Sequence, residues 1–89
     1  MTLQESIKAG DFSEDVVIEI SLCRDIDLIL SALKRRDCPP ALLIMFANSP
    51  HKNLRLAVAK HVNTPKAVRE RLISDSDRDV VKAARRAKE

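Results

Sequence analysis

The chain has 89 residues, of which 45% are hydrophobic and 33% charged, with a formal net charge of +3. It contains one glycine, no tryptophan and no tyrosine. A single glycine argues against a hairpin-rich β protein and excludes glycine-rich phosphate loops. The lack of tryptophan and tyrosine removes most of the aromatic side chains on which single-stranded nucleic acid could stack, and it requires an aliphatic core.

From residue 11 onwards, the chain repeats itself in three blocks of equal length, 11–36, 37–62 and 63–88. We predict one helical-repeat domain over 1–89, with a leading helix over 1–10 and these three repeats. Four columns of the aligned repeats are apolar throughout, namely Val16, Leu42 and Val68; Ile20, Phe46 and Leu72; Leu28, Leu54 and Val80; and Ala32, Val58 and Ala84. Each repeat therefore carries two apolar pairs spaced i, i+4, each on one helix face. Such repeats are typical of stacked arrays, whose units bury their apolar faces against neighbours.

In chain order, the pattern predicts helices over 2–9, 13–22, 26–36, 39–48, 53–62, 65–74 and 78–87. Gly10 is expected to end the first helix. Two polar columns are expected at helix starts, where side-chain oxygens accept free backbone N–H groups. They are Asp11, Asp37 and Asn63, and Asp27, Asn53 and Asp79. Pro39 and Pro65 are expected in first helical turns, and Ser76 is expected to open a capping box that ends at Asp79.

The segment 41–47 is apolar on all sides. We expect it to be covered on several sides as the central element of the stack; the alternative is that it forms a homodimer interface. The third repeat carries Arg69, Glu70 and Lys82 at positions that are apolar in the first two repeats. Such substitutions are expected of a terminal repeat with one face in water, and a piece of a longer array is the alternative.

Charge is unevenly distributed along the chain. The first repeat holds six acidic and four basic residues, whereas the third holds eight basic and four acidic residues. The difference, −2 against +4, favours head-to-tail contact between copies or an oriented partner. Ordinary surface variation is the alternative explanation.

Two segments of the repeat resemble a known family. Asn63–Leu72 resembles the opening of a leucine-rich repeat variant unit, and Leu54–His61 resembles the second segment of that unit, with a hydrophobic–Arg pair followed by alternating Ala and Val. The likeness is clear over 37–88 and faint over 11–36. It implies an all-α fold, a short right-handed α-solenoid of stacked helix pairs related to HEAT and armadillo arrays.

One further column is basic. Lys34, Lys60 and Arg86 align, and Lys8 lies one period before Lys34. Four cations in register would form a ladder, with rungs about 10 Å apart, that suits a phosphate backbone or an acidic partner. Alternatively, each cation only stabilises its helix C-terminus, by about 0.3–1 kcal/mol. The remaining candidates for partner binding lie nearby in sequence: Arg55, Lys82 and Arg85.

No catalytic or metal-binding pattern is found in the sequence. His51 and His61 lack the spacing of metal ligands. The alternating aspartates Asp75, Asp77 and Asp79 fit helix capping better than a calcium loop, whose glycine and final glutamate are missing. We therefore expect no enzyme activity, no metal and no cofactor.

The two cysteines, Cys23 and Cys38, form no CxxC pair. Some members of the leucine-rich repeat variant family carry an N-terminal cysteine cluster that binds an iron–sulfur centre, and this chain does not match it. We expect Cys38, which directly precedes Pro39, to be structural. The alternative is a partly exposed thiol at a helix N-terminus, where its pKa would be lowered.

These features lead to one leading hypothesis and two alternatives. The leading one is a cytoplasmic helical-repeat module that binds another protein, and not a membrane, through the surface of its second helices; a signal-peptide pattern is missing. The first alternative is a nucleic-acid-binding module that uses the basic ladder. The second is a helical-repeat DNA-repair enzyme, which the lack of Trp and Tyr disfavours.

Overall fold

The described part of the chain is built from α-helices and short connections. A computed structural model describes residues 1–88, with side chains through residue 86; Glu89, the last residue of the predicted domain, lies outside the described residues. Residues 1–88 form seven helices: α1 (Leu3–Lys8), α2 (Glu14–Leu22), α3 (Ile26–Leu33), α4 (Pro40–Phe46), α5 (Lys52–Lys60), α6 (Lys66–Leu72) and α7 (Arg78–Lys88). Every predicted helix is present, and the all-α prediction is confirmed.

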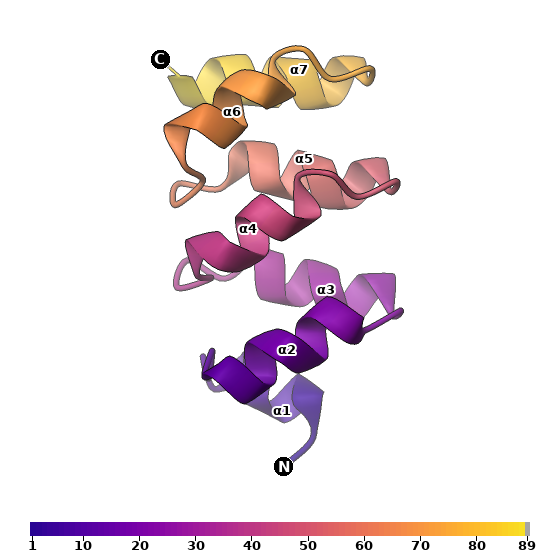
Figure 1. Ribbon diagram of the computed structural model, residues 1–89, viewed down its shortest axis with the longest axis vertical. Helices are drawn as coiled ribbons and strands as arrows, with labels where there is room; N and C mark the ends of the chain where they lie inside the picture. The colour runs from indigo at the N-terminus through magenta and orange to yellow at the C-terminus, as the bar shows by residue number, and fades with distance from the viewer. Residues whose placement is uncertain (89) are drawn as a thin grey trace.

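The helices lie in two rows that follow the long axis of the molecule (Figure 1). In the odd-numbered row, α1 packs against α3, α3 against α5 and α5 against α7. In the even-numbered row, α2 packs against α4, and α6 follows with a similar inclination (Figure 1). The molecule measures 38 × 22 × 16 Å, so successive helix pairs extend it in one direction.

The core consists of the apolar columns that the sequence predicts. Ten of the twelve positions are buried, and the other two, Leu28 and Phe46, are half-buried against the core. Ile20, Leu42 and Val58 are among the side chains with no exposed surface. The predicted inner faces of the helices are therefore confirmed, because the i, i+4 spacing brings each apolar pair to one side of its helix.

The prediction that Asp27, Asn53 and Asp79 cap helices is wrong by two positions. These residues occupy the second position of α3, α5 and α7. The capping carboxylate of α3 belongs to Asp25, which accepts a hydrogen bond from the backbone N–H of Leu28 at 3.2 Å. At α7, Asp77 accepts from the N–H of Val80 at 3.2 Å, so Asp77 replaces Ser76 as the cap. The extended backbone before the helix is where a short side chain reaches these N–H groups.

The other polar column lies in the loops, three residues before α2, α4 and α6, and its predicted capping role is wrong. Asp11 accepts from the backbone N–H of Ser13 at 3.0 Å, whereas Asn63 donates to the carbonyl of Arg36 at 2.7 Å. Pro39 and Pro65 directly precede α4 and α6 with extended ψ angles and leave no side-chain cap. Asp11 and Asn63 therefore form hydrogen bonds within and between the loops instead of capping helices.

Hydrogen bonds between loops connect one repeat to the next. A guanidinium nitrogen of Arg35 donates to the carbonyl of Lys8 at 3.0 Å. Nε2 of His61 lies 2.6 Å from the carbonyl of Arg35, which stands one period of 26 residues earlier in the chain. Since Nδ1 of His61 accepts from the backbone N–H of Asn63 at 2.9 Å, Nε2 must be the protonated nitrogen that donates. These bonds connect equivalent turns of successive repeats.

Gly10 ends α1 with a left-handed backbone, at φ +72°. A Cβ at this position would lie 2.6 Å from a carboxylate oxygen of Asp37 and 2.8 Å from a guanidinium nitrogen of Arg35. Its prediction as a helix stop is confirmed, and the positive φ angle favours glycine, whereas the side-chain ends of Arg35 and Asp37 could move away from a Cβ.

The apolar segment 41–47 is covered on one side and open on the other. Leu42 and Leu43 have no exposed surface, whereas the side chains of Ile44 and Met45 are 46% and 44% exposed. The expectation of cover on several sides is therefore wrong, because α4 lies at the outer surface of the even-numbered row. Exposure of Ile44 also means that Glu70, its counterpart in the third repeat, replaces a residue that already faces water.

Candidate functional site

The predicted basic column lies along the odd-numbered row. Lys8 and Lys60 are the last residues of α1 and α5, Lys34 directly follows α3, and Arg86 lies in the last turn of α7. All four side chains are exposed. Because equivalent helices end at equivalent positions, the period of the repeat places the four cations at the same end of successive helices. Each cation also lies where it stabilises the helix dipole, so capping accounts for its position without a ligand.

A groove lies between each pair of successive helices in this row, and the three grooves are lined by equivalent columns of the repeat. The groove between α3 and α5, the α3–α5 groove, has a volume of about 360 Å³. Four apolar side chains, which we call its floor, line the groove together with two lysines, an asparagine and a histidine: Leu30, Leu33, Leu56, Ala57, Lys34, Lys60, Asn53 and His61. Lys34 and Lys60 therefore lie over an apolar surface that is open to solvent.

The α5–α7 groove continues this surface, with a volume of about 590 Å³. Leu56 and Lys60 line both grooves, and α7 adds Lys82 and Arg86. The one carboxylate in the lining belongs to Asp79, which lies 3.6 Å from Nζ of a lysine outside the groove. We call the four cations over these two grooves the basic face: Lys34, Lys60, Lys82 and Arg86.

The first rung of the ladder differs in its surroundings. Lys8 lines a groove of about 300 Å³ between α1 and α3, together with Arg35. Asp25 and Asp27 line the same groove, so its two positive and two negative charges balance. We therefore leave Lys8 out of the basic face, although it keeps the register of the column.

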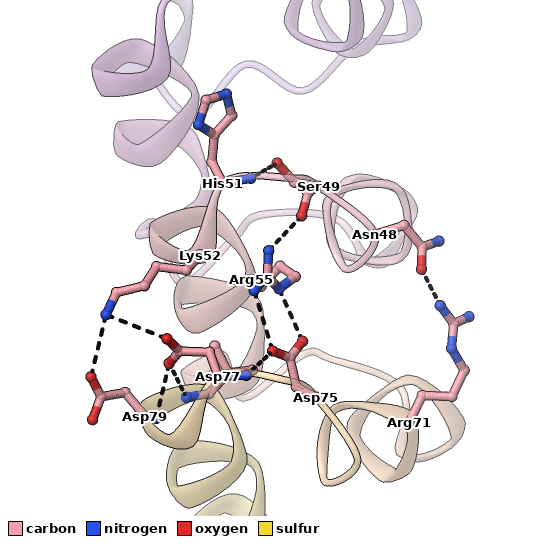
Figure 2. A network of polar contacts seen from close by, with 10 residues as sticks. Asn48, Ser49, His51, Lys52, Arg55, Arg71, Asp75, Asp77 and Asp79 are labelled. Atoms are coloured by element: carbon pink, nitrogen blue, oxygen red, sulfur yellow. Dashed lines mark hydrogen bonds and ion pairs between the residues drawn. The ribbon is translucent and has the colours of Figure 1, made fainter.

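Arg55 lies apart from the basic face, and its guanidinium group is bound within the protein (Figure 2). Its Nε lies 2.9 Å from Oδ2 of Asp75, and it donates to the carbonyl of Ser49 at 2.8 Å. The side chains of Arg55 and Asp75 are only 15% and 9% exposed. The structure therefore assigns Arg55 to internal packing, in contrast to the predicted binding role. Arg85 is exposed on α7 and lines neither groove of the basic face.

The alternating aspartates all have structural partners, and Asp77 and Asp79 share Lys52, as Figure 2 shows. Asp75 pairs with Arg55, and Asp77 caps α7 while it lies 3.4 Å from Nζ of Lys52. Hydrogen bonds from the backbone of α7, with the Lys52 charge in support, hold the pKa of Asp77 below its usual value. Within the described residues, no group of three or more His, Cys, Asp or Glu side chains could hold a metal ion.

Sequence reasoning missed the pair of Arg55 and Asp75, although one signal was present. The counterparts of Arg55 in the other repeats are Ile29 and Val81, so a charged residue stands in an otherwise apolar column. A charge at such a position requires an internal partner, because burial without one is costly. The partner lies 20 residues away, which spacing alone does not reveal.

The two cysteines lie in different surroundings. Cys38 has no exposed surface, and burial, with a smaller contribution from the Asp37 charge, raises the pKa of its thiol to about 11. Cys23 is half-buried, and both cysteines are free thiols. The structural role predicted for Cys38 is confirmed, since a thiol of this pKa stays protonated and unreactive at neutral pH.

Helices long and apolar enough to cross a membrane do not occur in the described part of the chain. In comparisons with models of known families, with curated proteins and with solved structures, no significant match to this chain is found.

Proposed function

We propose that this chain is a protein-binding module without catalytic activity, built as a short right-handed α-solenoid of the HEAT and armadillo kind. Three observations support the architecture: a period of 26 residues, apolar columns of which ten of the twelve positions are buried, and loop hydrogen bonds between equivalent turns. The resemblance of Leu54–His61 and Asn63–Leu72 to leucine-rich repeat variant units agrees with it. Arrays of this kind present extended surfaces to their partners.

The single observation that carries the binding role is the apolar floor beneath the basic face. Leu30 and Leu56 are half-buried against the core and line the grooves with their remaining surface, and covering such surface contributes roughly 25 cal/mol per Å². Lys34, Lys60 and Arg86 surround this floor with positive charge, which selects and orients an anionic partner. A protein segment that combines carboxylates with aliphatic side chains satisfies both features.

The test is a selection of random peptides displayed on phage against the immobilised protein. We expect enrichment of peptides that combine Asp or Glu with Leu, Ile, Val or Phe. A synthetic peptide from that selection should bind the variant K34E/K60E about tenfold or more weakly than the native protein, as measured by fluorescence anisotropy.

The matched control reverses two exposed cations outside the grooves, Arg24→Glu and Arg78→Glu, and changes the net charge equally. This variant should bind the peptide almost as well as the native protein. Equal loss in both variants would mean that only net charge matters, and a selection without enrichment would also contradict the proposal.

Nucleic acid is the second candidate ligand, favoured by the equivalent positions of Lys34, Lys60 and Arg86. A net charge of +3 and a surface without Trp or Tyr predict weak retention of an oligonucleotide that disappears as salt is raised. Gel shifts with labelled single-stranded DNA and RNA over a salt series test this. Retention at physiological salt that K34E/K60E abolishes would favour nucleic acid over a protein partner.

A further inference from the structure

The even-numbered row carries an exposed apolar patch that the basic face does not involve. Ile44 and Met45 on α4 are 46% and 44% exposed, and Ile18 and Leu22 on α2 are 49% and 76% exposed. Neighbouring exposed aliphatic side chains of this size mark a surface that another molecule covers. Figure 1 shows α2, α4 and α6 together on the side of the molecule that faces the viewer.

Charge changes sign along the same row. The exposed residues of α2 include Glu14, Asp15 and Glu19, whereas those of α6 include Lys66 and Arg71, with Glu70 between them. Helix α4, Pro40–Phe46, contains no charged residue at all. The face is thus acidic at α2, apolar at α4 and mainly basic at α6.

The repeat places opposite charges at equivalent positions of α2 and α6. Glu14 aligns with Lys66 and Glu19 aligns with Arg71, since the members of each pair stand two periods apart in the sequence. At the corresponding positions of α4, the chain has Pro40 and Met45. A rotation that exchanges α2 with α6 and returns α4 to itself therefore brings Glu14 to Lys66 and Glu19 to Arg71. In the same register, Asp15 meets Ala67 and Glu70 meets Ile18.

We propose that the exposed face of α2, α4 and α6 is the interface of a two-fold symmetric homodimer. The symmetry axis runs along α4, so that α4 packs on α4 of the second copy and α2 lies opposite α6 of that copy. Glu14 then faces Lys66 of the second copy, Glu19 faces Arg71, and Ile44 and Met45 form the apolar centre. The same contacts occur twice, as an isologous interface requires.

Charge complementarity selects this arrangement over its alternatives. A two-fold axis along the row would place α2 on α2, with the carboxylates of Glu14, Asp15 and Glu19 against their own copies. Head-to-tail contact, which the uneven charge along the chain also allows, would leave the apolar surface of α4 exposed and would not close. Because the face covers only three short helices, we expect a weak dimer whose population depends on concentration.

The experiment is sedimentation equilibrium at low salt, from micromolar to millimolar concentration. The native chain should associate to a dimer. One variant reverses α2, with Glu14→Lys and Glu19→Lys, and a second reverses α6, with Lys66→Glu and Arg71→Glu. Each alone should dimerise about tenfold or more weakly than the native chain, because like charges then face each other.

An equimolar mixture of the two variants should recover association. Reversed α2 of one variant then meets reversed α6 of the other at one end of the interface, and native α2 meets native α6 at the other end, so opposite charges face each other at both ends. Circular dichroism of each variant establishes that it is folded, so loss of association is not loss of structure. A native chain that is monomeric at all concentrations would overturn the proposal. So would a mixture that associates no more than its components.

The apolar centre is tested separately with Ile44→Ser, which should weaken dimerisation at any salt concentration. The control is Val62→Ser, which removes another exposed aliphatic side chain, 69% exposed, from a loop outside these helices. If both substitutions have the same effect on association, the α4 surface is not the interface. None of these experiments changes a residue of the basic face, so their outcome does not depend on the proposed partner binding.

Discussion

At the scale of single residues, the internal ion pair and the cysteines have the most direct consequences. Arg55 is a charged residue in a column that is apolar in the other repeats, and its guanidinium group donates a hydrogen bond to the carboxylate of Asp75. Cys38 lies in the core, whereas Cys23 lies nearer the surface. Each of these residues can be compared with a less buried residue of the same type elsewhere in the chain.

Removing one partner of the Arg55–Asp75 pair should destabilise the fold. We expect Arg55→Met or Asp75→Asn to lower the free energy of unfolding by about 2 kcal/mol, because the remaining polar group stays in a site that is 15% or 9% exposed. The double variant should lose less than the sum of the two. Urea unfolding of all four proteins measures the coupling.

The exposed pair of Arg35 and Asp37 is the matched control for this double-mutant cycle. Its side chains are 34% and 51% exposed, so its coupling should be clearly smaller. Equal coupling for the two pairs would contradict the internal role of Arg55.

The two thiols should differ in reactivity. In the native protein near neutral pH, iodoacetamide should modify Cys23 and leave Cys38 unmodified, because burial protects Cys38 and raises the pKa of its thiol to about 11. In urea, both should react. Mass spectrometry counts the adducts, and modification of Cys38 at the rate of Cys23 in folded protein would show that this part of the core opens readily.

At the scale of elements, helix boundaries depend on caps that differ from one repeat to the next. The residues directly before α3, α5 and α7 are Asp25, His51 and Asp77, and the two aspartates form side-chain caps. His51 makes no such hydrogen bond at α5. The apolar columns recur in every repeat because they build the shared core, whereas each cap serves its own helix.

The cap of α7 should make stability depend on pH. The pKa of Asp77 in the folded protein is lowered from 3.8, first by the backbone hydrogen bond from Val80, so the ionised carboxylate favours folding. This contribution is complete above the unfolded pKa and is lost as pH falls through the lower folded pKa. The stability difference between the native chain and Asp77→Ala should therefore be largest near neutral pH and shrink below about pH 3.8.

The measurement compares urea midpoints of the two proteins at neutral and acid pH. Asp37 has a lowered pKa as well, because it accepts hydrogen bonds from Arg35, so both proteins lose stability in acid. Only the difference between them reports on Asp77. A difference that stays constant from neutral to acid pH would mean that the charge of the cap contributes nothing.

At the scale of the whole molecule, hydrogen bonds between turns join each part of the chain to the next. The turns after α1, α3 and α5 are joined in succession, by Arg35 to Lys8 and by His61 to Arg35. In such a chain, one complete repeat can be removed while the flanking repeats still present matching surfaces.

Deletion of residues 37–62 tests this property. The shortened chain keeps the period, so we expect a helical circular dichroism spectrum and a cooperative urea transition at a lower midpoint, because a smaller fold buries a smaller share of its surface. Deletion of residues 37–58 is the control, since it breaks the register, and it should give an unfolded chain. Equal loss of helicity in both deletions would contradict the repeat architecture.

What the sequence by itself determined is the set of helices and their inner faces. The positions of Val16, Ile20 and Ala32 in the period were enough to predict buried helix faces, because apolar spacing is a property of the local chain and the repeat displays it three times. The same register identified Lys34 and Lys60 as equivalent cations.

Only the tertiary structure decided which of these side chains meet. Arg55 contacts Asp75, 20 residues away. Lys8 shares its groove with Asp25 and Asp27 and is therefore not part of the basic face. The open surface of α4 likewise depends on the position of α4 in the even-numbered row. Such contacts depend on which helices become neighbours and on the direction in which each helix presents its side chains, and neither is contained in the spacing of residues along one helix.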